Sequence, residues 1–339
     1  MSLLITKPGL LTTVQDIGRF GAQKYGVIVG GAMDAAALRI ANLLVGNDEG
    51  EAGLEITMLG PEMILDRAMT ISICGGDLSP KLDGEPVPMW RTVFAAKGSC
   101  LQFGTLKQGC RAYLAVGGGL DIPVQMGSRS TYLRAGIGGF QGRALRAGDR
   151  IPLRVPSHRS RKWLGAMALA SGGARFAASR WSVSHDLIPP YAESPATIQV
   201  LAGQEIHLFR EESVHAFFNA TYTVLPQSDR MGYRLTGETL ELKERKEMIS
   251  SAVTFGTIQV PSDGKPIVLM ADRQTTGGYP KIAQVITADL PLLSQVNLGG
   301  RVRFCLVSLR EAQKAYVMRE QAIQTLRCGL EQRIEEIEL

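Results

Sequence analysis

The chain has 339 residues, of which 45% are hydrophobic and 20% are charged. This length favours two domains over one, and the balance of apolar and charged residues excludes bulk disorder. The net charge of +5 is spread along the chain, and the one local basic cluster, "SHRSRK" at 157–162, contains no aromatic residue. We therefore expect no nucleic-acid binding.

Membrane insertion, secretion and metal binding also lack a signature in the sequence. The first 19 residues show no charged region followed by an apolar core, and no stretch approaches 18 apolar residues. The five cysteines lack CxxC spacing, and the four histidines lack the spacing of metal ligands. We expect a cytoplasmic protein that neither contacts a membrane nor holds a metal.

The first strong element in the chain is a predicted helix over residues 33–47. Asp34 is placed to cap its N-terminus, its body is rich in Ala, Leu and Ile, and Gly46 is placed to end it. Helix N-termini also bind anions, but an Asp at the cap fills that place itself. Capping is therefore the preferred interpretation of Asp34.

Short β-prone runs, closed by Gly or Asp turns, dominate the rest of the chain. In the first half they cover residues 62–76, 99–106, 110–118 and 150–153. After a segment of little period at 154–196, they resume at 196–203, 206–211, 221–226, 256–261, 266–271 and 299–308. This spacing favours barrels or sandwiches over alternating strands and helices.

The chain ends in a predicted helix, for which Ser308 and Glu311 have the spacing of a capping box. The elements divide the sequence into four parts: an N-terminal β domain at 1–155, a connecting segment at 156–195, a C-terminal β domain at 196–308, and the terminal helix at 309–339.

The densest polar loop covers residues 272–281 and follows the strand at 266–271. Adjacent glycines allow backbone N–H groups to converge on an anion, and an arginine can grip a carboxylate or phosphate with two hydrogen bonds. A polar turn with incidental charges is the structural alternative. The candidate catalytic residues are Asp272, Arg273 and Lys281, and the candidate binding residues are Thr275, Thr276, Gly277, Gly278 and Tyr279.

A second Asp–Arg sequence occurs at Asp229 and Arg230. It forms either a structural ion pair at a strand end or part of a cleft shared with Asp272 and Arg273. In a cleft, Asp229 would join the candidate catalytic residues and Arg230 the binding residues. A carboxylate base beside a cationic clamp suits attack on an amide carbonyl.

Two donor-rich loops in the first half are weaker candidates for anion binding. One is the glycine-rich turn with Gln15, Asp16 and Arg19, and the other contains Ser128 and Arg129. Both remain open between a binding role and a structural one. The chain has no GxxxxGK[ST] phosphate-binding loop, no GxSxG nucleophile elbow and no AMKM-like lysine motif, so we expect no covalently attached biotin.

Several long segments resemble one family. They include "TTVQDIGRFGAQKYGVIVGGAMD" (12–34), "RAYLAVGGGLDIPVQMGSRSTY" (111–132), "SDRMGYRL" (228–235) and "GTIQVPSDGKPIVLMADRQTTGGYPKIAQVITADLPLL" (256–293). With these segments the chain resembles the family of the C-type subunits of 5-oxoprolinase from about residue 3 to residue 308. That family is also called allophanate hydrolase subunit 2-like or biotin-dependent carboxyltransferase, and similar segments occur in urea carboxylase.

The resemblance implies a mainly β fold of two tandem cyclophilin-like β-barrel domains with a few helices. It also implies a hetero-oligomer with two partners, a cyclophilin-like B-type subunit and an A-type subunit, which together cleave 5-oxoproline to glutamate with hydrolysis of ATP. Without a phosphate-binding loop, ATP would bind at a site of another type or at one shared with the partner. Two alternatives stay open: a regulatory protein that binds a sporulation-kinase inhibitor related to the B-type partner, and a carboxyltransferase or allophanate hydrolase-type subunit.

Overall fold

The computed structural model describes residues 1–244 and 248–337, and the chain divides into two compact units. Unit 1 comprises Met1–Arg19, Asp34–Ile188 and Gln321–Leu339, and unit 2 comprises Phe20–Met33 and Pro189–Glu320. The described residues form 21 β-strands and five α-helices, which confirms the predicted mainly β class. The predicted domain bounds at 155, 195 and 308 stay predictions.

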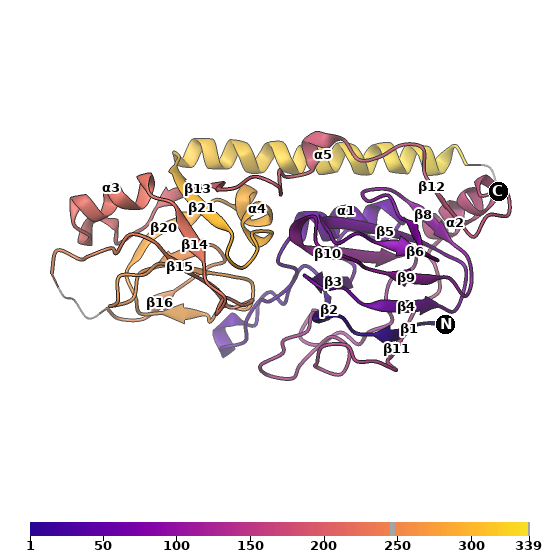
Figure 1. Ribbon diagram of the computed structural model, residues 1–339, viewed down its shortest axis with the longest axis horizontal. Helices are drawn as coiled ribbons and strands as arrows, with labels where there is room; N and C mark the ends of the chain where they lie inside the picture. The colour runs from indigo at the N-terminus through magenta and orange to yellow at the C-terminus, as the bar shows by residue number, and fades with distance from the viewer. Residues whose placement is uncertain (245–247, 338–339) are drawn as a thin grey trace. The chain divides into compact units, whose positions relative to one another are not determined.

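Unit 1 contains two six-stranded antiparallel sheets (Figure 1). In spatial order, the first consists of β11 (Arg150–Pro152), β1 (Ser2–Lys7), β4 (Glu62–Leu65), β9 (Cys100–Gln102), β6 (Lys81–Leu82) and β7 (Glu85–Pro86). The second consists of β12 (Phe176–Ala178), β8 (Val93–Ala95), β5 (Met69–Asp77), β10 (Gln108–Val116), β3 (Gly53–Thr57) and β2 (Leu11–Gln15).

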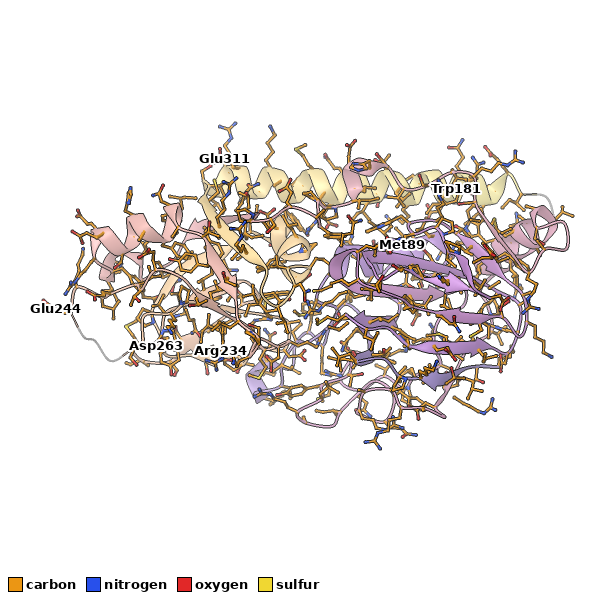
Figure 2. All side chains as sticks on the ribbon, viewed as in Figure 1. Met89, Trp181, Arg234, Glu244, Asp263 and Glu311 are labelled. Carbon is orange, nitrogen blue, oxygen red and sulfur yellow. The ribbon has the colours of Figure 1, made fainter. Side chains whose placement is uncertain are left out.

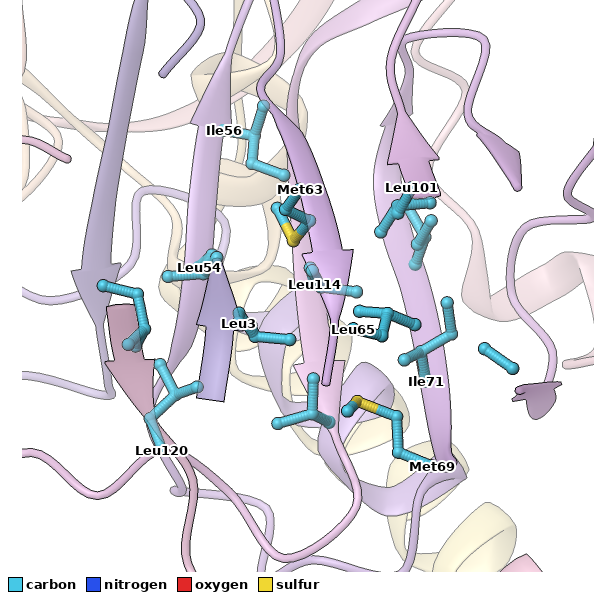
Figure 3. Close-up of a cluster of buried hydrophobic side chains, with 14 of the residues drawn as sticks. Leu3, Leu54, Ile56, Met63, Leu65, Met69, Ile71, Leu101, Leu114 and Leu120 are labelled. Carbon is cyan, nitrogen blue, oxygen red and sulfur yellow. The ribbon is translucent and has the colours of Figure 1, made fainter. Parts of the chain in front are cut away.

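One hydrophobic core joins the two sheets of unit 1. Figure 3 shows Leu3, Met63 and Leu65 of the first sheet in the same cluster as Leu54 and Leu114 of the second. Because side chains alternate between the faces of a strand, the residues between these core positions point to the opposite face of the second sheet. That face carries the polar residues described below.

Helix α1 (Ala35–Leu44) begins as predicted, because the Asp34 carboxylate accepts a hydrogen bond from the backbone N–H of Ala37 at 2.9 Å. Gly46 follows its end with a φ of 72°, a conformation that glycine adopts at low cost. Helix α2 (His158–Ala170) forms within the segment that showed little period. Its cap is Ser157, and its buried stripe is too thin to give a strong helical pattern, since it contains only Ser160, Trp163 and Met167.

Unit 2 is built on a closed seven-stranded barrel. Its strands, in spatial order, are β13 (Ala196–Ala202), β20 (Lys281–Val285), β17 (Thr257–Gln259), β18 (Ile267–Leu269), β15 (Gly232–Thr236), β14 (Tyr222–Val224) and β21 (Arg301–Leu306). Strands β13 and β21 close the barrel in parallel, and the other pairs are antiparallel. Helices α3 (Glu211–Asn219) and α4 (Leu290–Ser294) belong to the same unit.

The predicted strand at 206–211 is wrong. Residues Ile206–Leu208 form a turn of 3₁₀ helix, and α3 starts at Glu211. Glu211 and Glu212 lie in the first turn of that helix, where the helix dipole favours negative charge. The apolar alternation of the preceding residues resembled a strand, but these acidic residues favour a helix start.

The terminal helix α5 (Leu309–Glu335) has the predicted capping box. The Glu311 carboxylate accepts hydrogen bonds from the backbone N–H and hydroxyl of Ser308, and the Ser308 hydroxyl accepts one from the Glu311 N–H. Its residues up to Glu320 belong to unit 2 and the later ones to unit 1. Across the described ranges, every helix falls short of the combined length and apolarity that a membrane span needs.

Candidate functional site

The loop at 272–281 begins where β18 leaves the barrel of unit 2. Met270 and Ala271 are fully buried, so the chain stays attached to the barrel core up to Asp272. The backbone N–H groups of Met270 and Asp272 donate to the carbonyls of Met231 and Arg230 at 2.9 and 2.8 Å. The loop is therefore fixed to the turn that precedes β15, and the structure brings the two Asp–Arg sequences together.

The ion pair at this junction joins Arg230 to Asp272. Arg230 donates through Nε and Nη2 to the two carboxylate oxygens of Asp272, each at 2.9 Å, and both side chains are 6% exposed. Arg230 Nη2 also donates to the carbonyl of Gly31 at 2.6 Å. Two parallel hydrogen bonds between charged groups give a strong and rigid contact. The pair acts as a fixed platform at the start of the loop.

Asp229 lies on the other side of this turn and is exposed. Its carboxylate accepts from the backbone N–H groups of Met231 and Gly232 at 2.8 and 3.3 Å, an arrangement that closes the turn before β15. Its predicted catalytic role stays a prediction.

Arg273 is the next residue after the ion pair and is also buried, with 9% of its surface exposed. Within the described ranges its Nε has no hydrogen-bond partner, and its Nη1 lies 3.5 Å from the carbonyl of Ala271. Burial lowers the pKa of its guanidinium to about 10, while the negative charge of Asp272 acts in the opposite direction. A buried cation in this state is well suited to receive an anion.

The rest of the loop contains β19 (Thr276–Gly277), which pairs with β16 (Ser251–Ala252) in a small two-stranded antiparallel sheet. Lys281 is buried, donates to the hydroxyl of Ser251 at 2.6 Å, and pairs with Glu205 at 3.6 Å. Its charge is thus already matched within the fold. Its catalytic role stays a prediction.

The backbone conformation of this loop does not itself require glycine, because neither Gly277 nor Gly278 has a left-handed φ. Their anion-binding role stays a prediction. A Cβ at Gly277 would lie 2.2 Å from the Nε2 of buried Gln259, so Gly277 permits close approach of the backbone to this amide. Of the predicted hydroxyl donors, Thr276 and Tyr279 are exposed and Thr275 is partly buried.

A cavity of about 1150 Å³ borders the end of the loop. It is lined by Gly278, Tyr279 and Pro280, by residues 239–244 and 260–264, and by Arg210 and Met248. Figure 2 labels Glu244 and Asp263, which mark two of these lining segments. The lining contains both charges and apolar side chains, and Arg273 is not part of it.

The first-half candidates come together in unit 1, around Asp16. Its carboxylate accepts from the N–H groups of Gly18 and Arg129 at 2.9 and 2.5 Å, and from the hydroxyls of Ser128 and Ser130 at 2.7 and 2.5 Å. Arg19 is fully buried and donates to the carbonyls of Gln125 and Ser130, each at 2.9 Å. These groups hold one another in place.

The remaining two candidates of unit 1 are similarly engaged. Gln15 donates to the hydroxyl of Thr13 at 3.1 Å and to the carbonyl of Thr131 at 3.2 Å. Arg129 donates to the carbonyl of Ile122 at 2.9 Å and lies 3.6 Å from the carboxylate of Glu51. The geometry favours the structural alternative for the cluster, and a binding role stays a prediction.

A buried polar group under α1 was missed from the sequence. Tyr113 donates to the Glu55 carboxylate at 2.8 Å and accepts from the backbone N–H of Asp34 at 2.7 Å. Burial raises the pKa of Tyr113, and the charges of Glu55 and Asp34 add to the effect. The sequence did contain an indication of this group. Glu55 lies between the core residues Leu54 and Ile56 of β3, so its side chain points to the opposite face of the sheet.

Known proteins are similar in sequence to this chain over most of its length. The family model for the carboxyltransferase domain, subdomains A and B, matches residues 25–306. The chain is 40% identical over 303 residues to the C-type subunit of 5-oxoprolinase from Haemophilus influenzae, covering 89% of this chain and 90% of that protein. It is also 40% identical over 314 residues to the protein of the same name from Escherichia coli, covering 92% and 94%.

A solved structure shows the same fold within a much longer protein. The urea amidolyase of Kluyveromyces lactis superposes with a TM-score of 0.85 at 28% identity and covers 96% of this chain. The match takes up 20% of that enzyme's chain, so this chain spans about a fifth of its length.

Proposed function

The chain belongs to the family of carboxyltransferase domains with subdomains A and B, and from that premise we propose that it is the C-type subunit of an ATP-dependent 5-oxoprolinase complex. The observation that carries the proposal is the 40% identity over nearly the whole length of two proteins of that name. The shared length distinguishes these relatives from urea amidolyase, of which the chain matches one fifth. The motif resemblance to this family is thereby confirmed.

In the proposed reaction, the terminal phosphoryl group of ATP passes to the ring carbonyl oxygen of 5-oxoproline. Water then attacks the carbonyl carbon, and the ring C–N bond breaks as the nitrogen takes a proton. A second water releases phosphate from the resulting acyl phosphate and leaves glutamate. Negative charge develops on oxygen during these steps, and fixed positive groups in a dry site stabilise it.

The geometry of unit 2 supports a role in holding an anionic substrate. Arg273 supplies a buried positive charge on a loop that the Arg230–Asp272 pair fixes to the barrel. One guanidinium fits a single carboxylate or phosphate group better than a triphosphate chain. We propose that ATP binds at a site shared with the cyclophilin-like B-type partner, and that the A-type partner completes the complex.

The direct test is reconstitution of the chain with its A-type and B-type partners, followed by measurement of ADP and glutamate formed in the presence of 5-oxoproline. Turnover should require all three proteins. Arg273→Ala should lower it, whereas Arg234→Ala should not, because Arg234 is an exposed arginine on β15 of the same unit (Figure 2). A complete complex that forms neither product would overturn the proposal, and tight binding of the B-type partner without turnover would favour a regulatory role.

Carboxyl transfer is the second candidate, favoured by the TM-score of 0.85 with urea amidolyase. The chain has no AMKM-like lysine motif, so biotin would have to be carried by another protein. In that case turnover would require bicarbonate and would be blocked by avidin. The proposed 5-oxoprolinase reaction requires neither bicarbonate nor biotin, so the same reconstituted complex separates the two candidates.

A further inference from the structure

We infer that Arg273 is the anchor for the carboxylate of the substrate and makes the site selective for an acid over its neutral amide. The inference rests on the proposed function and adds to it the group by which the substrate is recognised. It assigns Arg273 to binding of a part of the substrate that does not react.

The positive charge of Arg273 has no ion pair at the start of the loop, in the part of the chain that the structure describes. Arg230 and Asp272 satisfy each other through two hydrogen bonds, with both side chains 6% exposed. Arg273, the next residue, adds a further positive charge that is 9% exposed. Lys281, the other cation of the loop, has a carboxylate partner in Glu205. Arg273 therefore brings a buried positive charge with no carboxylate within 4 Å among the described residues, and one monoanion would neutralise it.

The hydrogen bonds of Arg273 are also incomplete. Among the residues that the structure describes, its Nε has no partner, and the Nη1 contact to the carbonyl of Ala271 is long at 3.5 Å. A buried N–H group without an acceptor is costly, and a carboxylate can take two N–H groups of a guanidinium in parallel. 5-Oxoproline carries one carboxylate, which stays intact while the ring amide opens. Binding energy from such a remote group orients the reacting bond.

The same chemistry would suit a phosphate oxygen of ATP, so the test must separate the two sources of anion. The reconstituted complex is assayed with 5-oxoproline and with its neutral carboxamide, 5-oxoprolinamide, at varied ATP. Arg273→Met keeps most of the side-chain volume without the charge, and Arg234→Met is the matched control on the exposed face of β15.

For Arg273→Met, kcat/KM with 5-oxoproline should fall by about 10- to 150-fold, the range for a hydrogen bond to a charged group. With the carboxamide, kcat/KM should change by less than about threefold, because no carboxylate is lost. Arg273→Lys should recover part of the activity on the acid. An equal loss on both substrates together with a raised KM for ATP would overturn the inference and assign Arg273 to phosphate.

Two further measurements keep the outcome distinct from failure of the proposed function. If the wild-type complex shows no turnover, that function fails, and the inference is judged by calorimetric titration of the same complex with 5-oxoproline and the carboxamide. Binding of the acid that Arg273→Met abolishes would support it, and no binding or equal binding of both compounds would overturn it. Arg273→Met should also leave the unfolding midpoint unchanged or higher, because it removes an unmatched buried charge. A clear drop in that midpoint would assign Arg273 to the fold instead.

Discussion

Two polar loops of this protein look alike in sequence and differ in how their charges are matched. In unit 1, the carboxylate of Asp16 accepts four hydrogen bonds, and the guanidinium of Arg19 donates to two carbonyls. In unit 2, Asp272 is taken up by Arg230, and Arg273 follows without an ion pair of its own in the described part of the chain. The carboxylate of the first loop is thus held by four donors of the fold, whereas the guanidinium of Arg273 in the second loop has no carboxylate partner in the described part of the chain.

This difference shows what distinguishes a structural polar cluster from a binding site. Both loops combine glycine, arginine and aspartate, and in both loops these Asp and Arg side chains are buried. What separates them is how the fold holds their charged groups: Asp16 accepts four hydrogen bonds, whereas Arg273 has one long contact to a carbonyl. Variants that remove one partner at a time therefore test the comparison directly.

The largest effect is expected from Asp272→Ala. It leaves Arg230 buried without its carboxylate and should lower the free energy of unfolding by about 3–5 kcal/mol. Urea denaturation measures the change, with Asp263→Ala, an exposed acid of the same unit, as the control expected to cost less than about 1 kcal/mol. A loss below about 1 kcal/mol for Asp272→Ala would contradict the view that the pair is a rigid platform.

The next largest effect is expected from Asp16→Ala. It should lower the free energy of unfolding by about 2–4 kcal/mol, because four donors lose their acceptor at once. Its effect should lie in stability alone: below the unfolding temperature, kcat/KM of the reconstituted complex should stay within about threefold of wild type. Arg273→Met should instead lower kcat/KM and leave the free energy of unfolding unchanged or higher. If Asp16→Ala impaired the reaction as strongly as Arg273→Met does, the two loops would not differ in the way described.

Gly277→Ala tests the packing of the second loop and should cost about 1–3 kcal/mol, since the added methyl group meets Gln259. Gly278→Ala is the matched control, because the nearest atom to its added Cβ would be the Ser250 hydroxyl oxygen at 3.2 Å, a side-chain atom that can move. Thermal unfolding of the two variants measures the difference. Equal midpoints would show that Gly277 is not needed for close approach.

The smallest effect concerns a matched pair near the surface of unit 1. Arg143 donates to both oxygens of Asp149 at 2.7 and 2.8 Å and thereby lowers the pKa of that carboxyl. A lowered pKa stabilises the fold above the unfolded pKa, and the stabilisation is lost as the pH falls. At pH 7 the free energy of unfolding of wild type should exceed that of Asp149→Asn by about 1 kcal/mol or less. Urea denaturation at several pH values measures it. The difference should shrink below about pH 4. A difference that is constant with pH would contradict this origin.

The sequence predicted those parts of the fold that depend on nearby residues. The cap at Asp34 and the capping box of Ser308 and Glu311 formed as expected, because each involves residues three apart. The predicted strand at 206–211 failed because its apolar alternation was given more weight than the acidic helix start after it.

The candidate site was less predictable, because its properties depend on residues far apart in the chain. The sequence left Asp229 and Arg230 open between a structural ion pair and a cleft shared with Asp272 and Arg273. Only the structure shows that Arg230 pairs with Asp272 and that Arg273 has no such pair in the described part of the chain. Likewise, Glu55 was missed because its partner, Tyr113, lies 58 residues away on a neighbouring strand. Local composition indicates where charges gather, and the contacts between distant segments decide which of them are matched.

The most direct test of the unmatched charge is the thermal unfolding of the reconstituted complex with and without 5-oxoproline. Wild type should be stabilised by the ligand, by an amount that grows with the logarithm of the ligand concentration above Kd. Arg273→Met should start from an equal or higher midpoint and gain clearly less than wild type at the same ligand concentration. If both proteins gained the same number of degrees, Arg273 would not hold the substrate, and the central difference between the two loops would be contradicted.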